Sequence, residues 1–338
     1  MPSDEQESRP ARQLRRSISL GAQILGWAVA AGLLLAAGLR LAHLDLWAPA
    51  AALQSAAPTY FLLAYPLVLG AALARRVRLL AVAAVLLACQ LWWFGSLLPV
   101  VHRSQVSRPG ETRVRVLSAN LLAENRQAVD LAGAITREAP DIVALQEYTW
   151  RNGGALGDAP ALGAYPYRLL APTWSPDGIA LFSRWPLSDQ QTVVLAGRQA
   201  LRATALTPAG PIVVVVAHTV APVDGSSTRA WADQLRAIAD FAAKVDGPLV
   251  IAADLNATPG NRQYAALTDR ARVRDVLAAT GSGYAMTWPA NRRLLPPLVR
   301  PDHILVGRGV VPLRGHTITD PGSDHRAVVA DVGLSPPR

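Results

Sequence analysis

Three long uncharged apolar runs in the first hundred residues constrain this 338-residue chain more than any other feature. They cover Ile18–Leu39, Trp47–Ala74 and Leu79–Val101. The first contains 22 residues, about the number that an α-helix needs to cross a hydrocarbon core roughly 30 Å thick. Trp92 and Trp93 lie toward the end of the third run, where aromatic rings suit a membrane interface. We therefore expect three transmembrane helices, at about residues 18–39, 47–74 and 79–101.

Two other interpretations of these runs are weaker. A cleaved signal peptide would need a shorter apolar stretch, followed by a small-residue cleavage site that is not evident here. A buried helical hairpin does not explain three such runs in succession. The runs contain no Asp, Glu, Lys or Arg, so anchoring is a simpler role for them than transport.

The arginines predict the orientation of the chain. The tail of residues 1–17 and the loop Arg75–Arg78 are rich in arginine, whereas the loop after the first run carries only Arg40 and Asp45. Since arginine-rich loops stay in the cytoplasm, the N-terminus is expected there and, after three spans, the C-terminal part outside. Four arginines soon after the third run oppose this, but long domains translocate largely regardless of charge. They are Arg103, Arg108, Arg113 and Arg115.

From Arg113 onward the chain has an α/β pattern, after a linker at residues 102–112. Short apolar strands are expected to alternate with two helices, at Asn125–Glu138 and Ser227–Val245. Strands outnumber helices, which favours two packed mixed β-sheets flanked by helices, over residues 113–334. The expected strands are Val114–Ser118, Ile142–Leu145, Gly178–Phe182, Ala200–Leu206, Ile212–Ala217, Val250–Ala253, Ile304–Val306 and Ala327–Val329.

Charge and cysteine content exclude some classes of protein. The net charge is +9, but residues 111–338 contribute only 23 basic against 20 acidic side chains. This part is less basic than expected of a dedicated nucleic-acid binder. Cys89 is the sole cysteine, so an internal disulfide and a cysteine-based zinc site are both excluded.

Polar side chains recur where the expected strands begin or end. Each has an ordinary alternative: the acids and amides could be turn or loop residues, and His218 could be a satisfied structural histidine. If the last two strands run antiparallel to the others, however, all these positions meet on one rim. Carboxylate and amide oxygens suit Mg²⁺ or Mn²⁺, and imidazoles suit proton transfer and oxyanion contacts, which together fit cleavage of a phosphate ester. The residues are Asn120, Glu147, His218, Asp254, Asn256, Asp302, Asp324 and His325.

Seven segments, in order, resemble the motifs of the endonuclease/exonuclease/phosphatase (DNase I-like) superfamily. They are LSAN ending at Asn120, LQE ending at Glu147, GIALFSRWP from Gly178, HTVAP from His218, ADLNATP around Asp254, PDHILV around Asp302, and SDH ending at His325. The resemblance implies a four-layer α/β-sandwich. Where the family has Gly-Asp-Phe-Asn, this chain has Ala-Asp-Leu-Asn, which keeps the acid and the amide.

The resemblance also implies roles for these residues. Glu147, with Asn120 beside it and Asp324 assisting, would hold the divalent metal. Asp254 would activate or orient the attacking water, and Asn256 would orient the scissile phosphate. His218 would donate to a phosphate oxygen, as would His325, whose tautomer Asp302 would hold. Tyr167 or Arg168 would add a phosphate contact, although that motif matches loosely.

We therefore expect a membrane-anchored, Mg²⁺-dependent phosphoesterase, with Mn²⁺ as the alternative ion, whose site faces outward. The expected partners are the lipid bilayer and a phosphorylated small molecule or lipid, with nucleic acid less favoured and no obligate protein partner evident. Three spans before such a domain resemble a membrane-anchored bacterial branch of the family, one member of which is linked to teicoplanin resistance. For that branch the substrate would be a polyprenyl phosphate or another cell-envelope phosphate. The alternatives are an extracytoplasmic nuclease and a non-catalytic resistance or binding protein.

Overall fold

The computed structural model describes residues 9–99 and 113–334 of the chain. They form two compact units. The apolar unit comprises residues 9–42 and 60–93, and the sandwich unit comprises residues 43–59, 94–99 and 113–334. The expected linker, 102–112, and the first eight residues of the expected tail lie outside the described residues.

The apolar unit is helical. It contains α1 (Arg9–Leu41), the short helix η1 (Phe61–Leu63), α4 (Ala64–Leu73) and most of α5 (Val77–Phe94). Two stretches are long and apolar enough to cross a membrane, Leu20–Leu41 and Val77–Leu97. They agree with the first and third runs of the sequence, and α1 already begins inside the expected tail.

The second run differs from its prediction as one straight helix. It is broken into α2 (Ala48–Ser55), α3 (Ala57–Tyr60), η1 and α4, with a bend of 51° after Ser55. The break at Ala56 lies two residues before Pro58, whose nitrogen has no proton to donate and whose ring crowds the carbonyl four residues earlier. Within residues 9–99 and 113–334 there are thus two candidate spans, or three if the bent pair counts as one.

The sandwich unit contains two six-stranded sheets, ordered β11-β12-β1-β2-β4-β3 and β5-β6-β7-β8-β10-β9. Both are mixed, because β1 and β2 are parallel, as are β7 and β8, while the other pairs are antiparallel. The strands are β1 (Arg113–Asn120), β2 (Ile142–Gln146), β3 (Tyr167–Ala171), β4 (Ile179–Ser183), β5 (Leu187–Leu195), β6 (Arg198–Thr207), β7 (Gly210–His218), β8 (Leu249–Asp254), β9 (Arg274–Asp275), β10 (Asp302–Val306), β11 (Val310–Thr319) and β12 (Arg326–Leu334).

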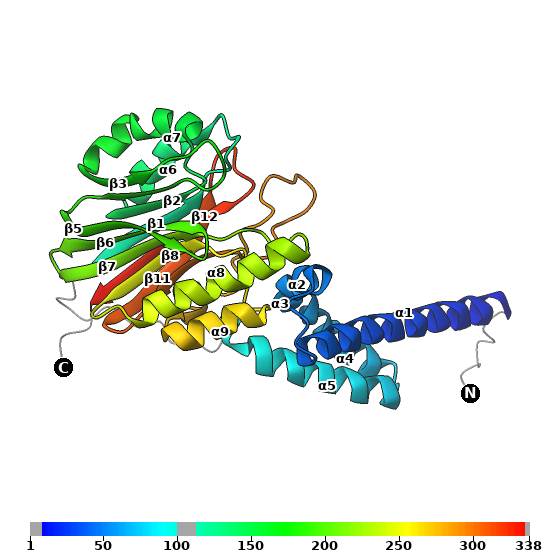
Figure 1. Ribbon diagram of the computed structural model, residues 1–338. Helices are drawn as coiled ribbons and strands as arrows, with labels where there is room; N and C mark the ends of the chain where they lie inside the picture. The colour runs from blue at the N-terminus through cyan, green and yellow to red at the C-terminus, as the bar shows by residue number, and fades with distance from the viewer. Residues whose placement is uncertain (1–8, 100–112, 335–338) are drawn as a thin grey trace. The chain divides into compact units, whose positions relative to one another are not determined.

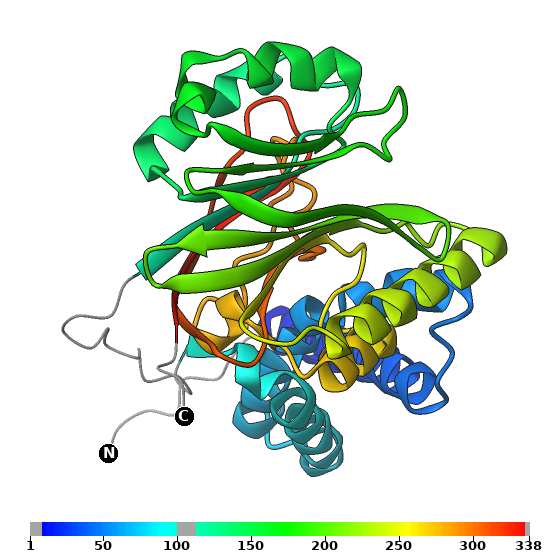
Figure 2. The same ribbon diagram turned by 60° about the vertical axis from the view of Figure 1, so that its left-hand side comes forward.

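Helices cover the outer face of each sheet, so the unit has four layers (Figures 1 and 2). One buried cluster lies between the sheets, a second under the helices beside β7 and β8, and a third under those beside β1 and β2. The expected fold of two mixed sheets flanked by helices is confirmed. The helices are η4 (Ala128–Asp130), α6 (Leu131–Glu138), α7 (Trp150–Gly157), η5 (Pro160–Ala164), α8 (Gly225–Ala243), α9 (Arg262–Ala271), α10 (Val276–Ala279) and η2 (Gly95–Leu97).

The valine run of β7 fits the position of this strand in the middle of its sheet. Val214 and Val216 belong to the cluster between the sheets, whereas Val213 and Val215 belong to the cluster under α8. Because successive side chains of a strand point to opposite faces, a strand with both faces covered is apolar at every position.

All eight expected strands are present, but β3, β5, β9 and β11 were not predicted. In β5 the pattern is weak because residues 189–192 are all exposed, which leaves no apolar alternation. The helix expected at Asn125–Glu138 begins its α-helical part only at Leu131. The preceding residues form η4 and a turn in which the Asn125 amide oxygen accepts from the backbone N–H of Gln127.

Residues 43–59, expected to lie largely in the membrane, are instead part of the sandwich unit. Asn261 Oδ1 accepts from the Thr258 backbone and from the Ser55 hydroxyl, and its Nδ2 donates to the Ala51 carbonyl. Thr258 Oγ1 donates to the Ser55 carbonyl at 2.8 Å. Asp45 Oδ2 accepts from the backbone N–H of Arg262 at 2.6 Å. These bonds join the segment to the loop that follows β8.

The close approach at this junction requires a glycine. A Cβ on Gly260 would lie 1.9 Å from the carbonyl oxygen of Gln54. We therefore expect Gly260→Ala to displace α2, to lower the free energy of unfolding by about 1–3 kcal/mol, as overpacking does, and to speed amide exchange across residues 48–55. Hydrogen–deuterium exchange of the detergent-solubilised full chain measures this. Gly163→Ala, with no atom within 4 Å of its new Cβ, is the matched control, and unchanged exchange in Gly260→Ala would contradict the packing described.

Candidate active site

The expected rim forms because the two late strands run in the required direction. Asp302 at the start of β10 pairs with Asp254 at the end of β8, and β12 runs antiparallel to β1. The parallel pairs β1–β2 and β7–β8 end at the same edge. Strand ends from both sheets and the starts of β10 and β12 therefore meet at one place.

Asn120 links two carboxylates of the rim. Its Nδ2 donates to Glu147 Oε1 at 3.0 Å and to Asp254 Oδ2 at 2.8 Å. Glu147 Oε2 also accepts from the backbone N–H of Ala123. Glu147 has a left-handed φ of 53°, a strained conformation of the kind that functional sites retain. Asn120 thus fixes residues from both sheets relative to each other.

His218 lies next to the carboxylates of Glu147 and Asp254. Its Nδ1 is 3.0 Å from the Pro176 carbonyl, which can only accept, so this nitrogen carries a proton. Its Nε2 faces the rim, 3.8 Å from Asp254 Oδ2 and 4.0 Å from Glu147 Oε1. Asn256 follows, with its backbone N–H donating to Asp254 Oδ1 and its Nδ2 to the Thr219 carbonyl.

Asp302 and His325 form a second buried pair. His325 Nδ1 and the Thr287 hydroxyl both donate to Asp302 Oδ2, at 2.8 and 2.6 Å. His325 Nε2 faces Asp254 Oδ2 and Asp324 Oδ1, each at 3.9 Å. Asp324 is more exposed and accepts from the Trp288 indole N–H. His218 and His325 therefore direct their Nε2 atoms at the same oxygen of Asp254.

Neighbouring charges determine the ionisation of this cluster. Burial alone would raise the pKa of Asp254, but the charges of His325 and His218 and the hydrogen bonds from Asn256 and Asn120 lower it below its usual range. Burial alone would lower the pKa of His325, but the charge and hydrogen bond of Asp302, helped by Asp254 and Asp324, raise it to about 10. At neutral pH Asp254 is a carboxylate and His325 an imidazolium.

The donor set fits a divalent cation. Asp254, Asp302 and His325 have candidate ligand atoms within 4.8 Å of one another, and buried Asp302 Oδ1 has no hydrogen-bond partner among the described residues. An orphaned carboxylate oxygen among carboxylates suits a hard cation. The imidazolium of His325 offers no lone pair, which leaves the carboxylates as the ligands. The Asn120 oxygen accepts from the Leu122 N–H, so it is the amide nitrogen that faces the carboxylates.

Tyr167 and Arg168 do not join the cluster. They lie on β3 opposite Ser183 and Phe182, whereas the rim is at the other end of that pairing, where Ile179 meets Gln146. The Arg168 guanidinium donates to three backbone carbonyls, those of Tyr165, Gly157 and Leu162. Its role in this structure is to hold η5 against β3.

Arg198 begins β6 near the rim, two residues before Ala200, which pairs with Ala217 next to His218, and the sequence did not indicate it. Burial lowers the pKa of its guanidinium, while the charges of Glu147 and Asp254 oppose that shift, so the group senses both carboxylates. Arg198 also forms an ion pair with Asp177. Arg198 lies before the apolar part of β6, which begins at Ala200. The pattern of apolar residues therefore did not mark Arg198 as the end of a strand.

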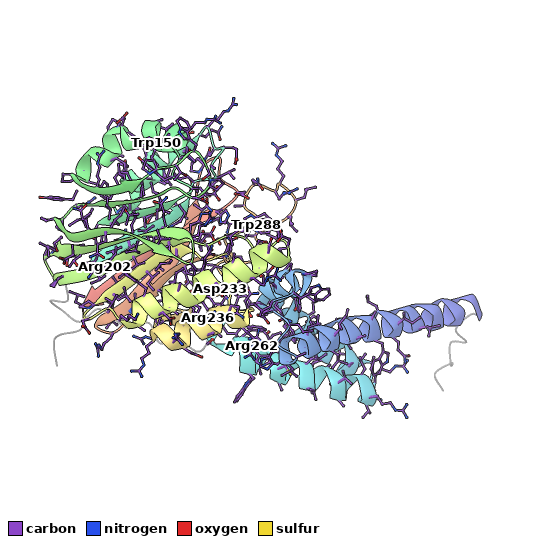
Figure 3. All side chains as sticks on the ribbon, viewed as in Figure 1. Trp150, Arg202, Asp233, Arg236, Arg262 and Trp288 are labelled. Atoms are coloured by element: carbon purple, nitrogen blue, oxygen red, sulfur yellow. The ribbon has the colours of Figure 1, made fainter. Side chains whose placement is uncertain are left out.

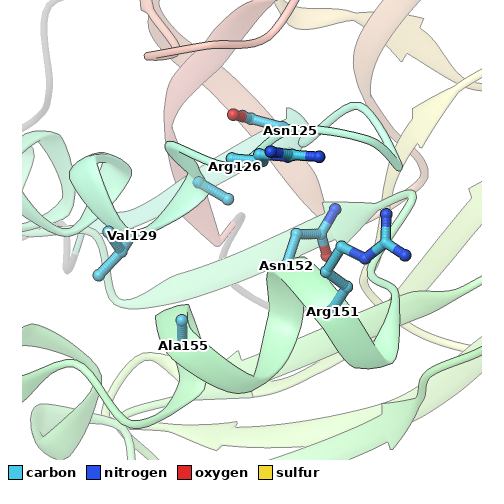
Figure 4. A pocket seen from close by; sticks show the side chains of 7 residues that line it. Asn125, Arg126, Val129, Arg151, Asn152 and Ala155 are labelled. Carbon is cyan, nitrogen blue, oxygen red and sulfur yellow. The ribbon is translucent and has the colours of Figure 1, made fainter.

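A pocket of about 400 Å³ lies beside the Glu147 loop (Figure 4). Asn152 is its buried floor, with Nδ2 donating to the carbonyls of Glu147 and Leu122. Arg126 and Arg151 line the same pocket and are exposed. Two cationic side chains next to the rim provide a positive approach for an anionic ligand.

The comparisons with known proteins agree with this geometry. Residues 117–325 match the model of the Endonuclease/Exonuclease/phosphatase family. No curated protein matches the chain. Among solved structures, an endonuclease/exonuclease/phosphatase from Beutenbergia cavernae is similar at 20% identity and a TM-score of 0.53, covering 66% of this chain and 72% of that one.

Two further structures are similar at 18% identity and a TM-score of 0.55. One is an endonuclease/exonuclease/phosphatase from Bacteroides vulgatus, with 67% of this chain and 100% of that one covered. The other is D. rerio TDP2 complexed with a single-strand DNA product, with 66% and 99% covered. At these identities the likeness shows a shared fold.

The ion pair of Asp302 with His325 generates a titration test. In metal-free protein His325 should keep its second proton through neutral pH and lose it as the pH rises through about 10. Asp302→Asn removes the opposing charge, so the pKa should fall toward the ordinary 6.5. Carbon-13 histidine NMR of the EDTA-treated full chain, with His325→Gln to assign the resonance, gives both midpoints. A wild-type midpoint near 6.5 would refute the described pair.

Proposed function

The chain belongs to the endonuclease/exonuclease/phosphatase family, and from that premise we propose that it is a membrane-anchored, divalent-metal-dependent phosphoesterase. The observation that carries this proposal is the rim itself. Glu147, His218, Asp254, Asp302 and His325 come from five separate strand ends or starts, and all lie within about 4 Å of another member. Their carboxylates and imidazoles, with the Asn120 amide bonded to Glu147 and Asp254, match hydrolysis of a phosphate ester.

Glu147 is the proposed principal ligand of the metal, with Asp254 and Asp302 as further carboxylates of the site. Mg²⁺ is the proposed ion and Mn²⁺ the alternative, because both prefer carboxylate oxygen. When bound, such an ion neutralises charge on the phosphate and on the leaving oxygen. Asp324, partly exposed and bonded to Trp288, is placed to assist through an outer contact.

The side chains of the rim supply the remaining requirements. Asp254, ionised and held on both oxygens by Asn120 and Asn256, orients the attacking water and accepts its proton. The Nε2 atoms of His218 and His325 approach the same oxygen of Asp254. His325, as an imidazolium, donates from Nε2 to one non-bridging oxygen of the phosphate, and His218 donates to a second one in its doubly protonated form. Attack of water in line with the leaving oxygen then needs no covalent enzyme intermediate.

Three arginines support an anionic substrate. Arg198 senses both Glu147 and Asp254, and we propose that it contacts the phosphate directly. Arg126 and Arg151 line the neighbouring pocket and would receive a further anionic part of the substrate. Fixed cations at a phosphate stabilise the charge that grows in the transition state.

Chain connectivity supports three crossings and an external site. Residues 43–59 and 94–99 both belong to the sandwich unit. The segment between them therefore starts and ends on the same side of the bilayer. If α5 crosses the bilayer, the stretch from Ala57 to Leu73 must also cross. Since Asp45 is bonded to the sandwich unit four residues after α1 ends, the N-terminus lies on the opposite side. With arginine-rich ends in the cytoplasm, the active site faces outward.

The proposed substrate class is a phosphate ester of the membrane or cell envelope, such as a polyprenyl phosphate. An enzyme held at the bilayer meets lipid-borne substrates at high effective concentration. A nuclease is the second candidate, because the exposed Arg126 and Arg151 could contact the phosphate backbone of a nucleic acid.

Substitution of the rim tests the mechanism. Asp254→Ala and His325→Ala should each lower kcat for a generic phosphomonoester or phosphodiester by about 10²–10⁴-fold, as loss of acid–base or charge-stabilising groups does. The assay uses the purified full chain with Mg²⁺, and circular dichroism and gel filtration check folding. Asp233→Ala, at an exposed acid on α8 that pairs with Arg236, is the control. Full activity in either rim variant would remove these role assignments.

A substrate panel separates the two candidates. With Mg²⁺ present, a polyprenyl phosphate, a phospholipid, a sugar phosphate and duplex DNA are compared, and EDTA should abolish every activity. We expect the lipid phosphate to be preferred. Preferential DNA cleavage that falls steeply with salt, by a log–log slope of about −0.9 per phosphate contacted, would favour the nuclease instead.

A further inference from the structure

The loop between Trp288 and Val299 presents an exposed tip with an unusual composition. Backbone pairing of Trp288 with Val299 closes its base. Every residue from Asn291 to Pro296, sequence NRRLLP, is exposed, and Leu294 is 99% and Leu295 44% exposed. Figures 1 and 3 show this orange segment extending from the sandwich unit, with Trp288 at its root. The tip of the loop therefore presents two adjacent solvent-exposed leucines.

The tip carries positive charge next to this apolar pair. Arg292 and Arg293 directly precede Leu294, and no acidic residue lies between Trp288 and Val299. Leucine beside arginine is the composition of segments that lie in the interface of an anionic bilayer, where the apolar side chains enter and the cations meet headgroups. The tip has no regular helix or strand.

The root of the loop is bonded to Pro58 and Thr59 on one side and to Asp324 on the other. On one side, Tyr284 Oη donates to the Pro58 carbonyl and Thr59 Oγ1 donates to the Leu298 carbonyl at 2.6 Å. Thr59 is followed in the chain by the apolar unit. On the other side, Trp288 Nε1 donates to Asp324 Oδ2 and the Ala290 N–H to the Asp324 carbonyl.

We propose that this loop tip inserts into the surface of the bilayer, with Leu294 and Leu295 in the interface and Arg292 and Arg293 on anionic headgroups. The proposal rests on the membrane anchoring proposed above. A bilayer is the occupant because the loop base is bonded to the residues from which the chain enters the apolar helices, and because the charge of the tip complements anionic lipid. Through Trp288 and Asp324, lipid contact then bears on the position of His325, the next residue of the site.

A depth measurement tests the insertion directly. The full chain with Cys89→Ala receives Leu294→Cys, is labelled with a bimane fluorophore, and is placed in nanodiscs of phosphatidylcholine and phosphatidylglycerol at 7:3. Brominated lipids should quench this probe at least about threefold more than a probe at Val194→Cys, an equally aliphatic position on β5 that is 69% exposed. With Arg292→Gln and Arg293→Gln added, or without phosphatidylglycerol, the quenching should fall.

The outcomes separate this inference from the proposed activity, because quenching needs no turnover. Equal quenching at the two positions, or none at Leu294→Cys, overturns the insertion even if the enzyme is active, and would leave the tip to a protein partner. A second readout uses Leu294→Asp with Leu295→Asp. This variant should keep its rate on a soluble phosphodiester and lose about tenfold on a lipid phosphate in the same nanodiscs, whereas equal loss on both substrates would contradict the proposal.

Discussion

Two buried carboxylates, Asp254 and Asp302, lie opposite each other in the pairing of β8 with β10, and the rest of the rim depends on the charge that they bring together. Buried like charges destabilise a fold unless hydrogen bonds and opposite charges compensate them. Here the compensation comes from both sheets: Asn120 from β1, His218 from β7 and His325 beside β12. A divalent cation would complete it. The same groups that make this carboxylate pair tolerable are those needed to bind and hydrolyse a phosphate ester.

The sequence could predict that these residues meet because each of them lies at the end or the start of a short apolar strand. The residues could meet only if β10 and β12 each run antiparallel to their neighbouring strands. The structure meets this condition, since β10 is antiparallel to β8 and β12 is antiparallel to β1. Local patterns could not reveal what depends on tertiary contacts. The edge strand β5 has no apolar alternation, and Arg198 lies just before the predicted strand Ala200–Leu206, although it belongs to β6. Arg168 donates to backbone carbonyls that only the folded chain brings together. The break before Pro58 was visible in sequence, but hydropathy alone gave one continuous run.

Residues 43–59 lie in sequence between α1 and the apolar helices that follow, and they are bonded to the loop after Asp254. They are apolar enough to have been assigned to a membrane, yet Ser55, Ala51 and Asp45 are bonded to the loop Thr258–Arg262, which directly follows Asp254 and Asn256. A second junction, from Pro58 and Thr59, reaches the loop that contacts Asp324. The active-site loops are thus supported by the segments through which the chain passes to its candidate spans. Under the proposed function, the substrate is expected at the bilayer surface.

The most direct test of the account is the location of a divalent ion. Crystals of the full chain soaked in Mn²⁺ would show its position by anomalous scattering. The account predicts one strong peak within coordinating distance of a carboxylate oxygen of Glu147, on the rim that also holds Asp254 and Asp302, and loss of that peak in Glu147→Gln. No peak at the rim, or a peak only at surface carboxylates away from it, would contradict the central claim that this rim is a metal-dependent phosphoesterase site.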